Sequence, residues 1–334
     1  MRPVSSEPAR TGHKDSMRHL IAVTTYFNPL QGRLRRRNYD VFRRELDLPL
    51  VAVEWSPEGR FELGDDAAEL LVRVSGGDLL WQKERLLNLG MARARAAWPG
   101  ADLVFLDCDV IFPNPGWSER VVEALDLHAA VQCFAEVAYL PPTAPMSGSR
   151  VTLANTAPEQ TLPSLASALV RGRPMFDPGA SPSSVWPAGS IPLRGNPGMA
   201  IALRPAALPG FRFYERNVIG GGDLLLAAAL AGRLEEAFTH RVYTSAHQAD
   251  LRAWAARSIA PGVGLGCVAE RLMHLWHGDL RDRRYSQRNV ILQQHEFDPV
   301  RDVDQDPTGG LRLASHAGAL RRAVAEYLAS RNDA

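Results

Sequence analysis

The sequence predicts an α/β fold in which helices cover both faces of a mostly parallel sheet. Short apolar runs of β-forming residues alternate with segments of helical periodicity through the first 140 of the 334 residues. Such short, strongly apolar strands are typical of sheets buried on both faces. Several of them end in polar side chains, and parallel sheets bind ligands beyond the carboxyl ends of their strands.

In the first half of the chain, we expect strands at residues 19–26, 48–55, 69–76, 102–109 and 130–137. Helices are expected at 82–97 and 118–128. Regular structure returns later in the chain, as a small-residue strand within 196–208 and helices within 220–234, 242–258 and 267–294. Near the C-terminus, helical spacing of apolar residues predicts a packing helix within 306–334, at Leu320, Val324, Tyr327 and Leu328.

Two segments lack this regularity. Residues 1–17 are polar and have no apolar core, so we expect a disordered tail rather than a signal peptide. Residues 140–190 are rich in Pro, Ser, Ala and Gly, which predicts a flexible loop with one short helix near 162–171. A loop that covers the substrate and a merely flexible insertion both fit this composition.

Composition and charge exclude several classes of function. Lys and Arg total 38 against 37 Asp and Glu, so the net charge of +1 provides no field that steers the protein to nucleic acid. No stretch approaches the ~20 apolar residues of a transmembrane segment. The three cysteines are too far apart for a disulfide framework or a paired metal knuckle. These features lead us to expect a soluble, cytoplasmic protein without a nucleic-acid partner.

The run "LVFLDCD" ends in two carboxylates, Asp107 and Asp109. Residues i and i+2 of a strand point to the same side, so both could share one ligand while Cys108 points away. Two like charges repel unless a cation lies between them. Hard oxygen ligands suit Mg²⁺ or Mn²⁺, and a diphosphate could complete the coordination shell. The alternative is a pair of solvated surface acids.

Two further segments carry candidate groups. In "GGGDLLL", Asp223 opens a helix after three glycines and is either an N-cap or a general base that takes a proton from a hydroxyl. In "HLWHGD", His274 and His277 could share one face of a helix. His277 would suit a borderline metal such as Mn²⁺, and Trp276 offers an apolar platform for a sugar. The arginines that follow could bind phosphate, Arg288 among them.

Taken in order, these motifs resemble glycosyltransferases of the GT-A fold, in particular the family 2-like enzymes and their galactosyltransferase-type relatives. "FLDCD" looks like the DxD motif of that fold, and "NPGMAIALRPAALPGFRFYERNVIGGGDLLL" is similar to its acceptor half. "HLWHG", followed by "RRY" and "FDP", looks like the His segment of many bacterial members. The resemblance implies a single catalytic domain at 18–305 with a Rossmann-like sheet. Its nucleotide-sugar half would be 18–139 and its acceptor half 191–305.

The resemblance also implies an activity, namely hexosyl transfer from a nucleotide-sugar, by default a UDP-sugar, to a hydroxyl with inversion. The acceptor would be a saccharide, a lipid or a small molecule. Asp107 would lie near the diphosphate and, with Asp109 and His277, would bind Mn²⁺ or Mg²⁺. Asp223 would be the base. The nucleotide would be held by Thr24, Tyr26, Glu54 and Lys83.

Some residues depart from the pattern, and two other functions stay open. The second strand continues as "VEWSPEG" instead of ending in an acidic pair, and Gly222 precedes Asp223 where many members have Glu. Haloacid-dehalogenase-like phosphatases also have a strand that ends in DxD, but theirs is an early strand and has a Thr where this chain has Ile111. A catalytically silent sugar-nucleotide or glycan-binding protein could use the same fold.

Overall fold

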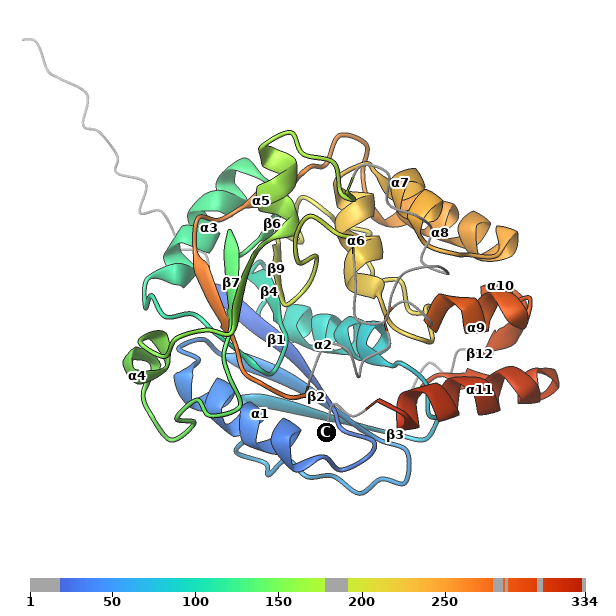
Figure 1. Ribbon diagram of the computed structural model, residues 1–334, viewed down its shortest axis with the longest axis horizontal. Coiled ribbons are helices and arrows are strands. Elements are labelled where there is room, and N and C mark those ends of the chain that lie inside the picture. The colour runs from blue at the N-terminus through green and yellow to red at the C-terminus, as the bar shows by residue number, and fades with distance from the viewer. Residues whose placement is uncertain (1–18, 178–191, 279–284, 286–287, 305–308, 332–334) are drawn as a thin grey trace, which may run out of the picture.

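The computed structural model describes residues 19–177, 192–278, 285, 288–304 and 309–331. The expected tail at 1–17 and part of the 140–190 segment lie outside these residues. A seven-stranded sheet with the order β10-β6-β9-β4-β1-β2-β3 forms the centre of the fold (Figure 1). Its strands are β1 (Leu20–Phe27), β2 (Leu50–Ser56), β3 (Leu70–Ser75), β4 (Asp102–Leu106), β6 (Ala130–Gln132), β9 (Ala200–Leu203) and β10 (Leu265–Cys267).

The sheet is mostly parallel, which confirms the predicted α/β class. Strands β1, β2, β3 and β4 pair in parallel, as do β6 and β10. Strand β9 runs antiparallel to its neighbours β4 and β6. The carboxyl ends of β1 and β4 therefore meet at one edge of the sheet.

Helices cover both faces of this sheet because alternate strand residues point to opposite sides. Val23 and Val51 pack under α2 (Lys83–Ala97), and Ala22 and Leu50 pack with α1 (Arg33–Glu45) on the other face (Figure 1). Gly90 lets α2 lie close to the strands, since a Cβ there would be 2.7 Å from Val23. Helix α3 (Trp117–Leu127) joins α1 on its face.

Helix α1 was not expected from the sequence. Its many arginines make the helical periodicity of the apolar residues hard to recognise. Tyr39, Val41 and Phe42 are nevertheless buried on one face of the helix. The Arg-rich stretch is thus the polar side of an amphipathic helix.

A second sheet, with the order β5-β11-β7-β8, stands beside the first. It contains β5 (Val110–Ile111), β11 (Arg271–His274), β7 (Glu136–Tyr139) and β8 (Gln160–Pro163). The single strand expected at 130–137 is therefore two strands, because the chain leaves the first sheet after β6 and enters the second as β7.

The segment expected to be a flexible loop, residues 140–190, is more regular than its composition suggests. Its described part contains α4 (Arg150–Ala154), β8 and α5 (Leu165–Val170), and α5 is the predicted short helix.

The remaining elements close the other side of the molecule. They are α6 (Gly222–Leu230), α7 (Leu234–His240), α8 (Ser245–Ser258), α9 (Arg288–Gln294), α10 (Pro299–Asp302), β12 (Val303–Asp304), β13 (Arg312–Leu313), a 3-10 turn at Ser315–Ala317 and α11 (Gly318–Ala329). Helix α11 buries the predicted apolar stripe against Leu80, Val218 and Leu292. Among the described residues, no helix combines the length and apolarity that a membrane crossing requires.

Candidate functional site

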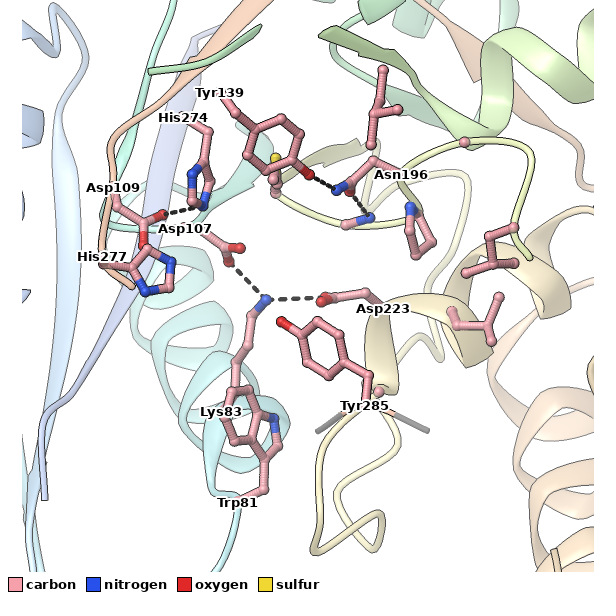
Figure 2. Close-up of a pocket in the computed structure, with 18 of the residues that line it drawn as sticks. Trp81, Lys83, Asp107, Asp109, Tyr139, Asn196, Asp223, His274, His277 and Tyr285 are labelled. Atoms are coloured by element: carbon pink, nitrogen blue, oxygen red, sulfur yellow. Dashed lines mark hydrogen bonds and ion pairs between the residues drawn. The ribbon is translucent and has the colours of Figure 1, made fainter. Parts of the chain in front are cut away.

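A cavity of about 410 Å³ lies beyond the carboxyl ends of β1 and β4 (Figure 2). The sequence predicts a ligand site at this edge. Five predicted site residues line the cavity, namely Lys83, Asp107, Asp109, Asp223 and His277. His274, which was not assigned to the site from the sequence, lines it as well. Main-chain segments around Gly195–Met199 and Gly221 complete the wall.

Three potential metal ligands converge on one side of the cavity. One ligand atom each of Asp109, His274 and His277 lies within 4.8 Å of the others, and all three residues are buried. Asp109 Oδ2 is 3.2 Å from His277 Nε2, and Asp109 Oδ1 is 3.8 Å from His274 Nε2. Figure 2 shows the three side chains facing one another.

Backbone pairing between β5 and β11 brings this cluster together. His274 pairs with Val110, which directly follows Asp109. The amide of Leu275 then donates a 2.9 Å hydrogen bond to the Asp109 carbonyl. The sequence suggested that the two histidines could share one face of a helix, but they do not lie on a helix. His274 ends a strand and His277 lies in the loop after it. Their rings nevertheless meet, with centroids 5.0 Å apart.

The donor set of this cluster fits a divalent transition metal. One carboxylate and two imidazoles suit Mn²⁺ and its neighbours in the first row, whereas Mg²⁺ prefers oxygen ligands alone. Of the two ions considered from the sequence, these residues therefore favour Mn²⁺. His274 was not among the predicted ligands, although the H-x-x-H spacing in "HLWHG" was the signal that could have identified it.

Asp107 pairs with a lysine instead of joining this cluster, and its role as a metal ligand stays a prediction. Its carboxylate Oδ1 is 2.7 Å from Lys83 Nζ, which is also 3.0 Å from Asp223 Oδ1. Lys83 is the first residue of α2 and Asp223 lies in the first turn of α6, so the N-termini of two helices position the ion pairs between Lys83 and the two aspartates. The cation between the carboxylates of Asp107 and Asp223 is an ammonium group of the protein itself.

Burial and mutual repulsion set the protonation of these groups. Burial raises the pKa of Asp107 to about 6; Lys83 opposes this rise, while the charges of Asp223 and Asp109 add to it. Burial alone would lower the pKa of Lys83, but the two carboxylates outweigh it and hold that pKa well above its usual value. The pKa of the neighbouring Glu84 rises to about 8 through burial and the charge of Asp223.

The residues predicted to hold the nucleotide at the first two strands lie elsewhere. Thr24 is fully buried and its hydroxyl donates to the Leu106 carbonyl at 2.7 Å. Tyr26 donates to the Glu62 carboxylate, and Glu54 accepts hydrogen bonds from the backbone N–H groups of residues 62 and 63. Tyr26 and Glu54 line a separate, smaller cavity. Their nucleotide contacts, and that of Thr24, remain predictions.

The alternation of β1 explains this placement. Successive side chains of a strand point to opposite faces, and it is Thr25 and Phe27 that line the large cavity. The sequence located the strand end but could not tell which of its two faces would meet the site. The structure also adds Trp81, Tyr285 and five arginines to the cavity wall, namely Arg35, Arg194, Arg241, Arg288 and Arg331. Arg288 was a candidate phosphate ligand from the sequence. The other candidates of its segment, Arg281, Arg283 and Arg284, lie outside the described residues.

Comparisons with known proteins give little further guidance. The chain matches no model of a protein family and no curated protein. Among solved structures it is similar to glucosyl-3-phosphoglycerate synthase from Mycobacterium tuberculosis, determined in complex with Mn²⁺, uridine diphosphate and phosphoglyceric acid. The identity is 14% and the TM-score 0.35, over 84% of this chain and 78% of that one. A likeness at this level carries no conclusion about function, which has to be argued from the site.

Proposed function

We propose that the protein is a metal-dependent glycosyltransferase that moves a hexose from a nucleotide-sugar, by default a UDP-sugar, to an acceptor hydroxyl with inversion. One observation carries the proposal: a single cavity holds a carboxylate–imidazole metal-donor cluster and, across a lysine ammonium, a second carboxylate at a helix N-terminus. A phosphate-bearing leaving group and a hydroxyl nucleophile need these two chemistries side by side.

The donor side of the site is the Asp109 cluster. Asp109, His274 and His277 would hold Mn²⁺, which supplies charge neutralisation for a departing diphosphate. Lys83 places a buried ammonium next to Asp107. From there its Nζ can donate to a diphosphate oxygen and stabilise the charge that develops as the bond to the sugar breaks.

The acceptor side is Asp223. Its side chain is 37% exposed, so a hydroxyl can approach the carboxylate. The N-terminus of α6 and the Lys83 ammonium both lie next to this carboxylate, which would accept the proton of the hydroxyl. Gly198 leaves room for this side chain, because a Cβ there would lie 2.7 Å from Asp223 Oδ2. A base opposite the leaving group favours a single displacement, which inverts the anomeric centre.

The test is release of UDP from a panel of UDP-sugars, with Mn²⁺ and with EDTA, in the wild type and three variants. Asp109→Asn should abolish the Mn²⁺-dependent turnover, and Asp223→Asn should lower turnover by about 10²–10⁴-fold. The exposed Asp65→Asn is the matched control and should change neither.

Three results would contradict the proposal. Turnover that EDTA does not reduce would remove the metal from the mechanism. An Asp223→Asn variant with full transfer activity would remove the base and favour a binding protein. A product that retains the anomeric configuration of the donor, read by proton NMR, would overturn inversion.

A further inference from the structure

Three arginines are buried in one wall of the cavity. Arg241, Arg288 and Arg331 are 3%, 6% and 6% exposed, and all three line the cavity with Trp81. They come from distant parts of the chain: the residue after α7, the first residue of α9 and the segment after α11. Burying a charge is costly, so three like charges gathered at one wall of an open cavity call for a functional explanation.

Aromatic rings and backbone position the guanidinium groups. Arg331 Cζ lies 5.0 Å from the Trp81 ring centre, and Arg288 Cζ lies 4.9 Å from that of Tyr285. Arg241 Nη1 donates to the Tyr285 carbonyl at 3.4 Å. A guanidinium stacked on a ring directs its N–H groups within its own plane, and this geometry suits bidentate contact with an oxyanion. The buried Nε of Arg288 makes no hydrogen bond to any described residue.

The three charges lie close enough to influence one another. Burial, followed by the charge of Arg288, lowers the pKa of Arg241 to about 10. Among the acids that the structure describes, Asp223 lines the same cavity, and the charge of Glu84 interacts with that of Arg288. Asp223 is bonded to Lys83, and Glu84, with a pKa of about 8, is largely neutral near pH 7. An anion that entered here would relieve the repulsion among the arginines.

This wall lies on the side of Asp223. A Cβ on Gly221 would come within 2.5 Å of Arg288 Nη2, and both Gly220 and Gly221 have positive φ angles. The glycine turn therefore packs directly on the guanidinium, two residues before Asp223. In Figure 2, Lys83 lies between the cluster of Asp109, His274 and His277 and the side chains of Asp223 and Tyr285.

We propose that Arg241, Arg288 and Arg331 form a subsite for an anionic group of the acceptor, a phosphate or a carboxylate. The assignment to the acceptor rests on the proposed function, which makes the Asp223 side of the cavity the acceptor side. The acceptor is then a small hydroxylated acid or phosphate ester rather than a neutral saccharide. Bidentate contacts from arginine would orient it so that its hydroxyl meets Asp223.

The experiment titrates inorganic phosphate and, separately, malonate into the full-length protein by calorimetry, with and without saturating UDP and Mn²⁺. Arg288→Gln and Arg331→Gln remove one charge each from the wall. Arg322→Gln, on the exposed side of α11, removes the same charge elsewhere and is the matched control. Circular dichroism and thermal unfolding establish that each variant is folded, and having two wall variants keeps the test informative if one is not.

We expect at least one of the two anions to bind the wild type equally well with and without UDP and Mn²⁺. Each wall variant should weaken that binding by about tenfold and leave UDP affinity within about twofold. No binding of either anion, or binding that the wall variants do not weaken, would overturn the subsite. Displacement of the anion by UDP, with UDP affinity lost in the variants, would assign the arginines to the donor diphosphate and refute the acceptor assignment. If the proposed function is wrong, the wild type should not bind UDP. The titration of the anion without UDP still tests the subsite in that case.

Discussion

Replacing Lys83 by Met tests the charge arrangement at the centre of the site. Lys83 is one of only two lysines in the chain, and its ammonium is bonded to both Asp107 and Asp223. Removing one partner of a fully buried ion pair costs about 3–5 kcal/mol, because the remaining charge stays buried. Here the Lys83, Asp107 and Asp223 side chains are 13%, 29% and 37% exposed. We therefore expect a loss of about 2–4 kcal/mol in the free energy of unfolding near pH 7.5.

The loss should shrink as the pH falls. Burial already raises the pKa of Asp107 from 3.8 to about 6, and without Lys83 that pKa should rise further. A carboxyl whose pKa is higher in the folded than in the unfolded state favours folding at low pH and loses that contribution as the pH rises. Each further unit of pKa is worth about 1.4 kcal/mol. The variant should thus recover part of its deficit between about pH 7.5 and pH 5.

The assay is urea denaturation followed by tryptophan fluorescence at both pH values. Arg322→Met, which removes an exposed positive charge, is the control and should change stability by less than about 0.5 kcal/mol. A Lys83→Met protein as stable as the wild type near pH 7.5 would refute the reasoning. A deficit that is the same at both pH values would refute the role given to Asp107.

The remaining predictions concern the metal donors, the base and a buried histidine. Replacing His274 or His277 by Ala should weaken Mn²⁺ binding by about 10–100-fold in a titration followed by electron paramagnetic resonance; an unchanged affinity would exclude that ligand. Asp223→Asn should keep Mn²⁺-dependent UDP binding within about twofold, whereas loss of that binding would place Asp223 in the donor site. Burial lowers the pKa of His247 to about 3, so the unfolded state alone takes up its proton below about pH 6.5. This residue should therefore lower the free energy of unfolding by about 2 kcal/mol between pH 7 and pH 5. A His247→Phe variant whose free energy of unfolding, measured by urea denaturation, falls as much as that of the wild type between these pH values would contradict this.

Much of the sheet could be predicted from the sequence because its strands are short, apolar and buried on both faces. The expected strands over β1, β2, β3 and β4 match the structure closely. Helix α1 could not be recognised in the same way, since its arginines outnumber the apolar residues of its buried face. The 140–177 segment owes its order to pairing between β7 and β8, a long-range contact that composition does not reveal.

Some residues that line the cavity could be predicted, because a local sequence motif contains them. Asp107 and Asp109 followed from the end of β4, and Asp223 followed from its place after three glycines. The sequence did not indicate which face of the β1 strand end would meet the cavity. Thr25 and Phe27 line it, whereas the predicted Thr24 and Tyr26 do not.

Groups that join only through the tertiary fold were also missed. His274 reaches Asp109 through the pairing of β11 with β5. Arg331 reaches the cavity from the end of α11, with no local signal in its own segment.

The most direct test of the account is calorimetric titration of UDP, GDP and dTDP into the wild type and His277→Ala, first with Mn²⁺ and then with EDTA. We expect the wild type to bind one nucleotide, UDP by default, with Mn²⁺ and to lose that binding with EDTA. His277→Ala should show the loss even with Mn²⁺ present. Binding that survives EDTA, or no nucleotide binding in either condition, would contradict a metal-dependent nucleotide-sugar site at Asp109, His274 and His277.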